Sequence, residues 1–297
     1  MCEKKLLLIV NPCSGKAKMK TELLSVVSVL SAGGYEVTVY PTKNRGDATV
    51  KVEELQKDEY EIIVACGGDG TLNEVITGIM NANLSCKLGY IPSGTLNEWS
   101  SGLGIARNIE DAAKDIVNGH EVYLDIGKFG DKYFSYTASF GAFTSASYSA
   151  PQEIKNVLGQ AAYFFEGIKS ISNIKPIPLK FTVDGRIIEG DFLFGAISNS
   201  MSVGGIVKFD ESVVKLNDGE FEILLIRNPD NILKFQPLID GILRKELNKE
   251  GMEFLHASNI TVEGAKDVSF TLDGEYAAGA EKIEIRNIHN AIKFIVP

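Results

Sequence analysis

Hydrophobic positions up to residue 124 follow two alternating spacings. Short, mostly apolar runs, typical of strands in a parallel sheet, occur at residues 6–10, 37–40, 62–66 and 88–91. Apolar positions at helical spacing separate these runs, at residues 23–30, 47–56 and 72–80. The alternation predicts an α/β N-terminal domain with a parallel sheet over residues 1–124. In such a domain ligands bind where the strands end.

Beyond residue 124 the pattern changes to strand-like runs without regular helices between them. Asp184 and Gly185 separate two of these runs, and this pair is a strong signal for a two-residue hairpin turn. Other strand-like runs lie at residues 191–197, 221–226, 259–262, 268–272 and 283–285, with helical stretches at 153–171 and 231–247. We therefore predict an antiparallel β-sandwich as a second domain, over residues 125–289. A last apolar run, within residues 290–297, could belong to either domain and so return to the first.

Composition narrows the class of protein. The chain has 297 residues, of which 44% are hydrophobic and 23% charged, as expected of a globular protein with room for two domains. No apolar run approaches the roughly 18 residues that span a bilayer, and the N-terminal run is too short for a secretory leader. A net charge of −9 argues against a nucleic-acid partner. Four cysteines without CxxC spacing are typical of a reducing compartment, so we expect a cytoplasmic protein.

The loop after residues 62–66 carries the first chemical signal. Its sequence, Gly67-Gly68-Asp69-Gly70-Thr71, stands directly between a predicted strand and a predicted helix. Glycines let backbone amides approach a phosphate closely, and the start of a helix adds free N–H groups and a positive dipole end. A plain glycine-rich turn capped by Thr71 is the alternative. The strand–loop–helix context favours a phosphate site.

Two more strand-end loops offer similar groups. Residues 11–16 (Asn-Pro-Cys-Ser-Gly-Lys) follow the first strand, and residues 92–98 (Pro-Ser-Gly-Thr-Leu-Asn-Glu) follow the fourth. Each alone is explained as a turn before a helix, but three such loops at one sheet edge favour a shared site. The better-known phosphate motifs do not fit. The Walker pattern lacks its first glycine and has Ala17 in place of a hydroxyl, and Asn73 breaks the dinucleotide fingerprint.

The three loops, in this order and spacing, resemble the diacylglycerol kinase catalytic family of bacterial lipid kinases, which is itself similar to sphingosine and ceramide kinases. The likeness continues through residues 158–163 (LGQAAY), Gly204-Gly205, residues 217–219 (NDG) and residues 272–275 (LDGE). The GGDGT loop alone is shared with NAD kinases, whereas the full set is specific. The resemblance implies an α/β nucleotide domain, a β-sandwich domain and ATP bound between them.

The same resemblance assigns ATP contacts by position. They fall in the three loops and at one threonine after the second strand: Asn11, Pro12, Cys13, Ser14, Gly15, Thr42, Gly67, Gly68, Asp69, Gly70, Thr71, Leu72, Asn73 and Thr95. Two positions depart from the family pattern. Glu98 stands where the family usually has Asp, which leaves the role of this carboxylate open. Trp99 stands where the family usually has Phe, which implies a change in packing.

Acidic turns in the second domain are explained by hairpin chemistry alone, and the resemblance separates them. It gives Asp184 no functional counterpart. It makes Asp218 a ligand of a structural Mg²⁺ in the second domain, together with the backbone carbonyls of Lys215 and Glu220. Oxygen ligands in a tight loop suit this hard cation.

Two carboxylates are expected to be catalytic. The resemblance makes Glu275 the general base that accepts the proton of a lipid hydroxyl, and Asp69 is the candidate to position the Mg²⁺ that bridges the ATP phosphates. The predicted reaction is an ATP- and Mg²⁺-dependent phosphorylation of a lipid, most simply diacylglycerol to phosphatidic acid. A relative of NAD kinase is one alternative, although its GSTAY-like segment is missing. A non-catalytic lipid- or nucleotide-binding protein is the other.

The expected partner is a lipid at the membrane surface. We therefore expect a cytoplasmic protein with transient peripheral contact to the inner face of the membrane and with no nucleic acid bound. Edge strands of either domain could pair two copies into a homodimer.

Overall fold

The computed structural model describes residues 4–17, 19–94, 97–141, 176–200, 202–203, 207–208, 215–229, 234, 237–238, 241–242, 244 and 246–297 of the chain. The predicted helix at 153–171 and the motifs at 158–163 and Gly204-Gly205 lie outside these residues, as does much of the predicted helix at 231–247. The chain forms two compact units. Unit 1 comprises Met1–Asp125 and Asn290–Pro297, and unit 2 comprises Ile126–His289. The chain passes from one unit to the other within β5 (His120–Phe129) and within β17 (Lys282–Val296).

Unit 1 is a parallel sheet in the order β17-β4-β3-β1-β2. Its strands are the end of β17, β4 (Lys87–Pro92), β3 (Ile62–Gly67), β1 (Lys4–Val10) and β2 (Tyr35–Pro41). Leu8 of the central strand β1 pairs with Val39 of β2 and Val64 of β3. Residues 6–10 of β1 and residues 62–66 of β3 are unbroken apolar runs because helices cover both faces of these strands.

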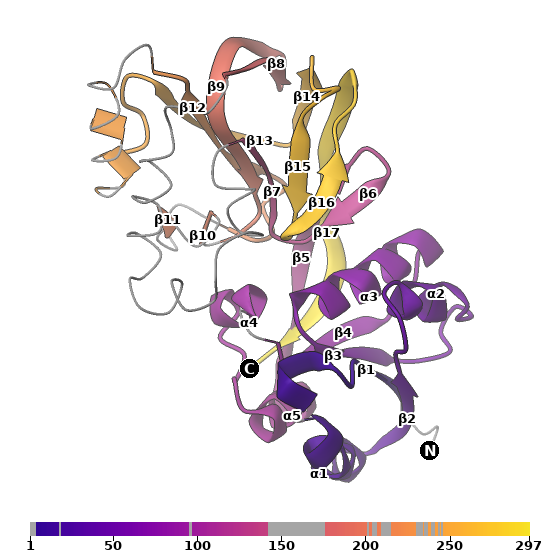
Figure 1. Cartoon of the computed structure of the whole chain (residues 1–297). Helices are drawn as coiled ribbons and strands as arrows, with labels where there is room; N and C mark the ends of the chain where they lie inside the picture. Colours follow the sequence, from indigo (N-terminus) through magenta and orange to yellow (C-terminus); the bar gives the residue numbers. More distant parts are fainter. Residues whose placement is uncertain are drawn as a thin grey trace. The chain divides into compact units, whose positions relative to one another are not determined.

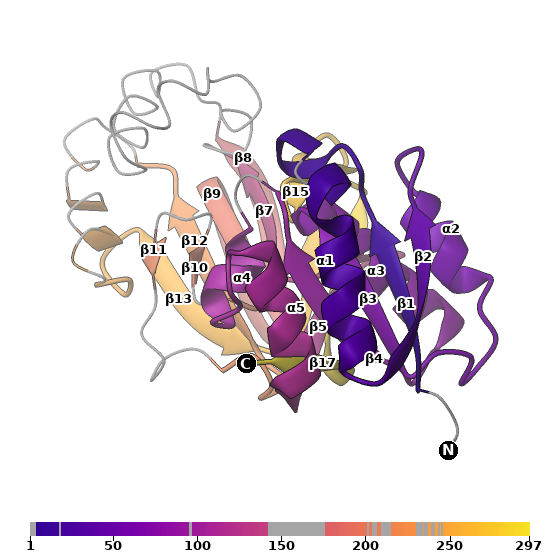
Figure 2. The same ribbon diagram turned by 90° about the horizontal axis from the view of Figure 1, so that it is seen from below.

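Helices α1 and α5 pack together on one face of this sheet, and α2 and α3 pack together on the other (Figures 1 and 2). The helical segments are η1 (Ser14–Ala17), α1 (Met19–Ala32), α2 (Asp47–Glu53), α3 (Asp69–Ala82), α4 (Glu98–Gly102) and α5 (Ile109–Asn118). Helix α2 ends three residues before the predicted boundary at residue 56. Leu55, just beyond its end, is buried in the core.

Unit 2 is built from antiparallel strands in the order β16-β15-β7-β9-β8-β14-β17, with β12 paired to β9 and β13 paired to β12. These strands are β7 (Thr137–Gly141), β8 (Ile177–Val183), β9 (Arg186–Ser198), β12 (Phe221–Arg227), β13 (Met252–Ala257), β14 (Asn259–Glu263), β15 (Ser269–Leu272) and β16 (Glu275–Ala278). Shorter strands are β6 (Lys132–Phe134), which pairs with β5, and the pair β10 (Ser202–Val203) and β11 (Val207–Lys208).

Aromatic side chains fill the core of unit 2. Phe140 on β7 contacts Phe181 on β8 and Phe270 on β15, with ring centroids 5.9 and 5.5 Å apart. These rings alternate along each strand with polar residues on the opposite face, as expected where one face of a sheet is buried. The predicted hairpin is confirmed: Asp184 and Gly185, both at positive φ, join β8 to β9. The predicted fold class, an α/β unit followed by an antiparallel sandwich, is confirmed as well.

Among the described residues, no helix combines the length and the apolar character required to cross a membrane.

Candidate functional site

Hydrogen bonds join the three predicted loops of unit 1. The Asn11 side chain donates to the Thr71 hydroxyl over 3.2 Å, which ties the first loop to the second. The hydroxyls of Ser14 and Ser93 lie 2.6 Å apart, which ties the first loop to the third. A Cβ added to Gly15, whose φ is 53°, would lie 1.9 Å from the Ser93 carbonyl oxygen, so only glycine fits this contact. The structure thus brings the three loops together at one edge of the sheet.

The first loop is held in a tight turn by its own groups. The Asn11 side-chain oxygen accepts a hydrogen bond from the Cys13 amide, and the Ser14 hydroxyl donates to the Asn11 carbonyl. Pro12 is half-buried and Cys13 is exposed. Thr42 lies beside this turn, because its amide donates to the last carbonyl of β1 over 2.8 Å.

The second loop brings backbone close to the third. A Cβ on Gly94 would lie 2.6 Å from the Cα of Gly68, so the two main chains are almost in contact. Gly68 is the N-cap of α3 and has no side chain to cap the helix, and its carbonyl accepts hydrogen bonds from the amides of Thr71 and Leu72 at 3.0 and 3.2 Å. The start of a helix is a favourable place for an anion such as a phosphate. Asp69 and Gly70, the first two residues of α3, are half-buried and exposed, respectively.

The other positions singled out in the sequence differ in their burial. Leu72 is fully buried in the core, so only its backbone can face a nucleotide. Thr95 and the side chain of Glu98 lie outside the described residues. Trp99, the departure from the family pattern, is almost fully buried and packs on Phe294 of β17, with ring centroids 5.4 Å apart. Asn73 is half-buried on α3.

Two buried side chains beneath the loops were not predicted, because both occupy apolar strands. The Tyr90 hydroxyl lies 3.4 Å from Asp69 Oδ1 and 3.2 Å from Asn97 Oδ1. Burial raises the pKa of Tyr90, and the negative charge of Asp69 raises it further. Burial also raises the pKa of the Cys66 thiol to about 12, against the effect of a hydrogen bond with Ser93. Both groups therefore stay protonated at neutral pH.

In unit 2, Glu275 is the first residue of β16 and is exposed. It follows the turn Asp273-Gly274, whose φ angles of 50° and 84° are those of a tight hairpin. The Asp273 carboxylate is buried and accepts hydrogen bonds from the amides of Ser135, Tyr136 and Thr137 and from the Ser135 hydroxyl, at 2.6–3.0 Å. Burial raises the pKa of Asp273, and these donors oppose that shift. Sequence reasoning missed this anchor because a hairpin already explained the Asp-Gly pair.

The predicted metal-binding turn, residues 215–220, precedes β12 in unit 2. Asp218 Oδ1 accepts a hydrogen bond from the Glu220 amide over 3.1 Å, and Lys215, Asp218 and Glu220 are all exposed. The Asn287 side chain donates to the Glu220 carbonyl. Among the described residues, no group of three or more His, Cys, Asp or Glu side chains could hold a metal.

The chemistry near this turn nevertheless suits a hard cation. Carboxylate and carbonyl oxygens are the ligands that Mg²⁺ prefers. Two buried acceptors, Asn287 Oδ1 and Glu222 Oε2, have no hydrogen-bond donor among the described residues. The negative charges of Asp218 and Glu220 add to burial, the larger cause, in raising the pKa of Glu222 to about 8. A cation at the turn would relieve this excess of acceptors. The residues therefore fit a metal ion whose ligands are mainly backbone carbonyl oxygens.

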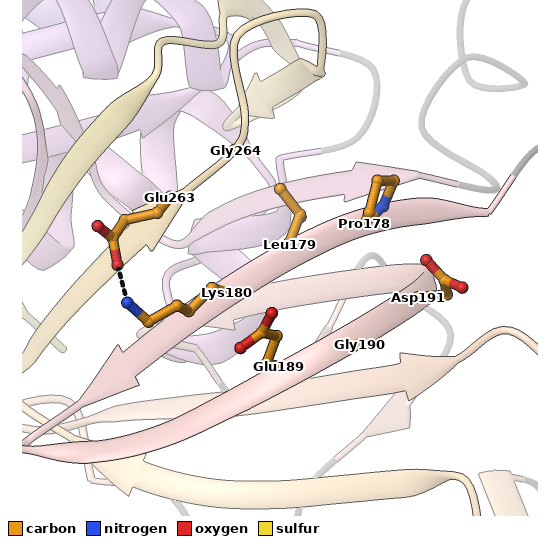
Figure 3. Close-up of a pocket in the computed structure, with 8 residues that line it drawn as sticks. All are labelled: Pro178, Leu179, Lys180, Glu189, Gly190, Asp191, Glu263 and Gly264. Atoms are coloured by element: carbon orange, nitrogen blue, oxygen red, sulfur yellow. Dashed lines mark ion pairs between the residues drawn. The ribbon is translucent and has the colours of Figure 1, made fainter.

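A pocket of about 360 Å³ lies in unit 2, and none of the predicted site residues lines it (Figure 3). Lys180 and Glu263, 2.7 Å apart, form an ion pair in its wall. Its lining residues are Pro178, Leu179, Lys180, Glu189, Gly190, Asp191, Glu263 and Gly264.

Comparisons with known proteins agree across both units. Residues 5–129 match the diacylglycerol kinase catalytic domain, and residues 138–294 match the YegS C-terminal NAD kinase beta sandwich-like domain. Proteins of Staphylococcus aureus strains RF122 and MRSA252, each named diacylglycerol kinase, are 32% identical over 98% of this chain and 91% of their own length.

Solved structures of Bacillus anthracis strain Sterne proteins are similar to this chain over nearly its whole length. One aligns with 99% of this chain and 95% of its own, at 28% identity and a TM-score of 0.83. Another, titled a diacylglycerol kinase, covers 99% of this chain and 97% of its own, at 27% identity and a TM-score of 0.77.

Proposed function

The chain belongs to the diacylglycerol kinase family of lipid kinases, and we propose that it transfers the γ-phosphate of ATP to a lipid hydroxyl, most simply from diacylglycerol to phosphatidic acid. The observation that carries this proposal is the meeting of the three strand-end loops through Asn11–Thr71 and Ser14–Ser93. Such loops offer many amides and hydroxyls to a chain of phosphates, which suits phosphoryl transfer.

Residues of unit 1 hold the nucleotide in this proposal. The amides at the start of α3 and the glycine-lined approach of Gly68 and Gly94 receive phosphate oxygens. Asn11 and Ser14 fix the first loop against the other two, and Thr42 borders the end of β1. Asp69 would hold the Mg²⁺ of the nucleotide, and the ion would neutralise negative charge that develops during transfer.

Residues of unit 2 act on the lipid. Glu275 orients the lipid hydroxyl and accepts its proton as the oxygen attacks phosphorus. Asp273 keeps the hairpin that carries Glu275 in one conformation, because its carboxylate accepts four hydrogen bonds from residues 135–137. Asp218, with the carbonyls of Lys215 and Glu220, holds a second Mg²⁺ that stabilises the fold of unit 2.

The assignment is tested by supplying purified protein with radiolabelled ATP, Mg²⁺ and a panel of acceptors in detergent micelles. The panel contains diacylglycerol, ceramide, a long-chain alcohol and NAD. We expect label in the organic phase with diacylglycerol and no labelled NADP. Label on NAD alone would replace the proposal with the NAD kinase alternative, and no transfer to any acceptor would favour a binding protein.

Substrate in a bilayer requires contact with a membrane surface, and we propose that this contact is transient and peripheral. Flotation with vesicles that contain diacylglycerol tests it, because bound protein rises with the vesicles. A homodimer formed through an edge strand is tested by light scattering over a range of protein concentrations.

A further inference from the structure

Tyr90 places a buried hydroxyl between two of the nucleotide loops. It lies on β4, opposite Ala65 of β3, and is 1% exposed. Its neighbours along the strand are apolar and pack in the core. A phenylalanine would satisfy the packing of this position equally well, so the hydroxyl needs a reason of its own.

Three acceptors surround the hydroxyl. It lies 3.4 Å from the Gly67 carbonyl, 3.4 Å from Asp69 Oδ1 and 3.2 Å from Asn97 Oδ1. A phenol carries one proton, so it can donate to only one of these oxygens at a time. All three distances exceed the roughly 2.7–2.8 Å typical of a committed O–H···O hydrogen bond, as expected of a proton shared among them.

The two uncharged acceptors already have donors. The Gly67 carbonyl accepts from the Ser93 amide over 2.8 Å, and Asn97 Oδ1 accepts from the Gly94 amide over 3.0 Å. The Asn97 amide group donates to the Gly94 carbonyl, so its oxygen is fixed toward Tyr90. A charged acceptor binds a donor more strongly than a neutral one. The Tyr90 proton therefore belongs mainly to Asp69.

From these contacts we infer that Tyr90 is a positioning residue for Asp69, which it holds in the orientation that receives the Mg²⁺ of the nucleotide. The inference rests on the proposed function. A phenolic hydroxyl has an ordinary pKa of about 10, so it is a hydrogen-bond donor at neutral pH. When a cation binds the Asp69 carboxylate, the Tyr90 hydroxyl can donate its hydrogen bond to Asn97 Oδ1 instead. Tyr90 thereby couples the second loop to the third without touching substrate.

The test is Tyr90→Phe, which removes the hydroxyl and keeps the ring. ATP binding is measured by calorimetry, without lipid, in the presence of Mg²⁺ and again with EDTA. Tyr123→Phe is the matched control, because Tyr123 lies on the surface of the same unit, 45% exposed and over Lys293. We expect Tyr90→Phe to weaken Mg²⁺–ATP binding about tenfold or more, as for loss of a hydrogen bond to a charged group. ATP binding in EDTA, and both measurements on Tyr123→Phe, should match the wild type.

A double-mutant cycle shows whether Tyr90 acts through Asp69. Tyr90→Phe should have no further effect in an Asp69→Asn background. Equal losses with Mg²⁺ and with EDTA, no loss at all, or a further loss in the Asp69→Asn background would each overturn the inference. Tyr90→Leu, which also lacks the hydroxyl, should behave in the same way and replaces the Phe variant if that variant does not fold. A wild type that binds no Mg²⁺–ATP would overturn the proposed function as well, whereas a different lipid acceptor leaves this test intact.

Discussion

At the scale of single residues, carboxylates in this chain differ by what surrounds them. Glu275 is exposed at the start of a hairpin strand, whereas Asp273, two residues earlier, is buried and accepts four hydrogen bonds. An exposed carboxylate can come into contact with a substrate. A buried carboxylate surrounded by donors is instead held in place and fixes the conformation of the backbone that donates to it.

The pair gives a sharp prediction. Glu275→Ala should abolish lipid phosphorylation and leave the free energy of unfolding nearly unchanged, because its side chain is exposed. Asp273→Ala should lower the free energy of unfolding by about 3 kcal/mol or more, because buried amides of residues 135–137 lose their acceptor. Urea unfolding and a lipid kinase assay on both variants, with Asp69→Ala as a second catalytic variant, provide the check. A stable Asp273→Ala protein would contradict the role of Asp273 as an anchor.

In protein kept free of metal with EDTA, Glu222 predicts a dependence of stability on pH. Its carboxyl is almost fully buried on β12, and its pKa is about 8 in the folded protein, against 4.5 for an ordinary glutamate. The folded chain therefore keeps a proton that the unfolded chain releases between these two pH values. The free energy of unfolding should fall there as pH rises, by up to about 1.4 kcal/mol per pH unit.

Glu222→Gln removes this titration and should flatten the profile between pH 4.5 and 8. Urea unfolding at several pH values within that window measures the difference between the variant and the wild type. The difference in the free energy of unfolding between the two proteins should grow toward the upper end of this pH window. A difference that stays constant with pH would contradict the prediction.

At the scale of elements, α2 and α3 are joined more closely than their lengths suggest. The N-cap of α2 is Gly46, which has no side chain to cap the helix. Glu74 of α3 takes this part, because its carboxylate accepts from the amides of Gly46 and Ala48 at 2.8 and 3.3 Å. Farther along, a Cβ on Gly78 would lie 2.6 Å from the Val52 side chain, so the helices are in direct contact.

Glu74→Ala should therefore release the start of α2 and lower the free energy of unfolding by about 1–2 kcal/mol, as for loss of a helix cap. The KM for ATP should rise in the same variant, because the segment between Thr42 and α2 loses its attachment to α3. Glu74→Gln keeps one acceptor oxygen, so its free energy of unfolding and its KM for ATP should lie between those of Glu74→Ala and of the wild type. An unchanged KM would show that Thr42 and its neighbours do not contact the nucleotide.

Much of the element pattern could be predicted because each central strand of unit 1 is a continuous apolar run. Helix α5 was missed. Its buried positions, Ile109, Ala112, Ala113 and Ile116, follow helical spacing, and Asn108 caps its start with a side chain, so the sequence did contain the signal for this helix. The strand-end loops were predicted as a set. The contacts that join them were not, since Ser14 and Ser93 are 79 positions apart and no local pattern encodes such a pairing. The same holds for Asp273 and Ser135, 138 positions apart.

At the scale of the whole molecule, unit 1 is discontinuous in sequence. Its sheet ends with β17, where Lys293 and Phe294 pair in parallel with Lys87 and Leu88 of β4. The Asn290 amide donates to the Asp125 carboxylate over 2.6 Å, and Asp125 is fully buried. Phe294 also packs on Trp99, the residue next to the third loop.

Removing residues 290–297 should therefore disable the nucleotide site without touching any of its loops. We expect the truncated chain to lose ATP binding in calorimetry and to bind a dye for exposed apolar surface, because β4 becomes an unpaired edge. Phe294→Leu, which keeps the strand and trims the ring contact, should bind ATP with a smaller loss. Full ATP binding by the truncated chain would rule out a structural role for this strand in unit 1.

The late return of β17 also sets an order of events on the ribosome. The strands of unit 1 except β17 are made before unit 2, and the partner of β4 within β17 is made only after unit 2. At about 5–20 residues per second, the apolar edge of β4 stays uncovered for a time on the order of tens of seconds. Unit 1 therefore cannot complete its sheet until unit 2 has been made, and fast folding of unit 2 would shorten the time during which this apolar edge can aggregate.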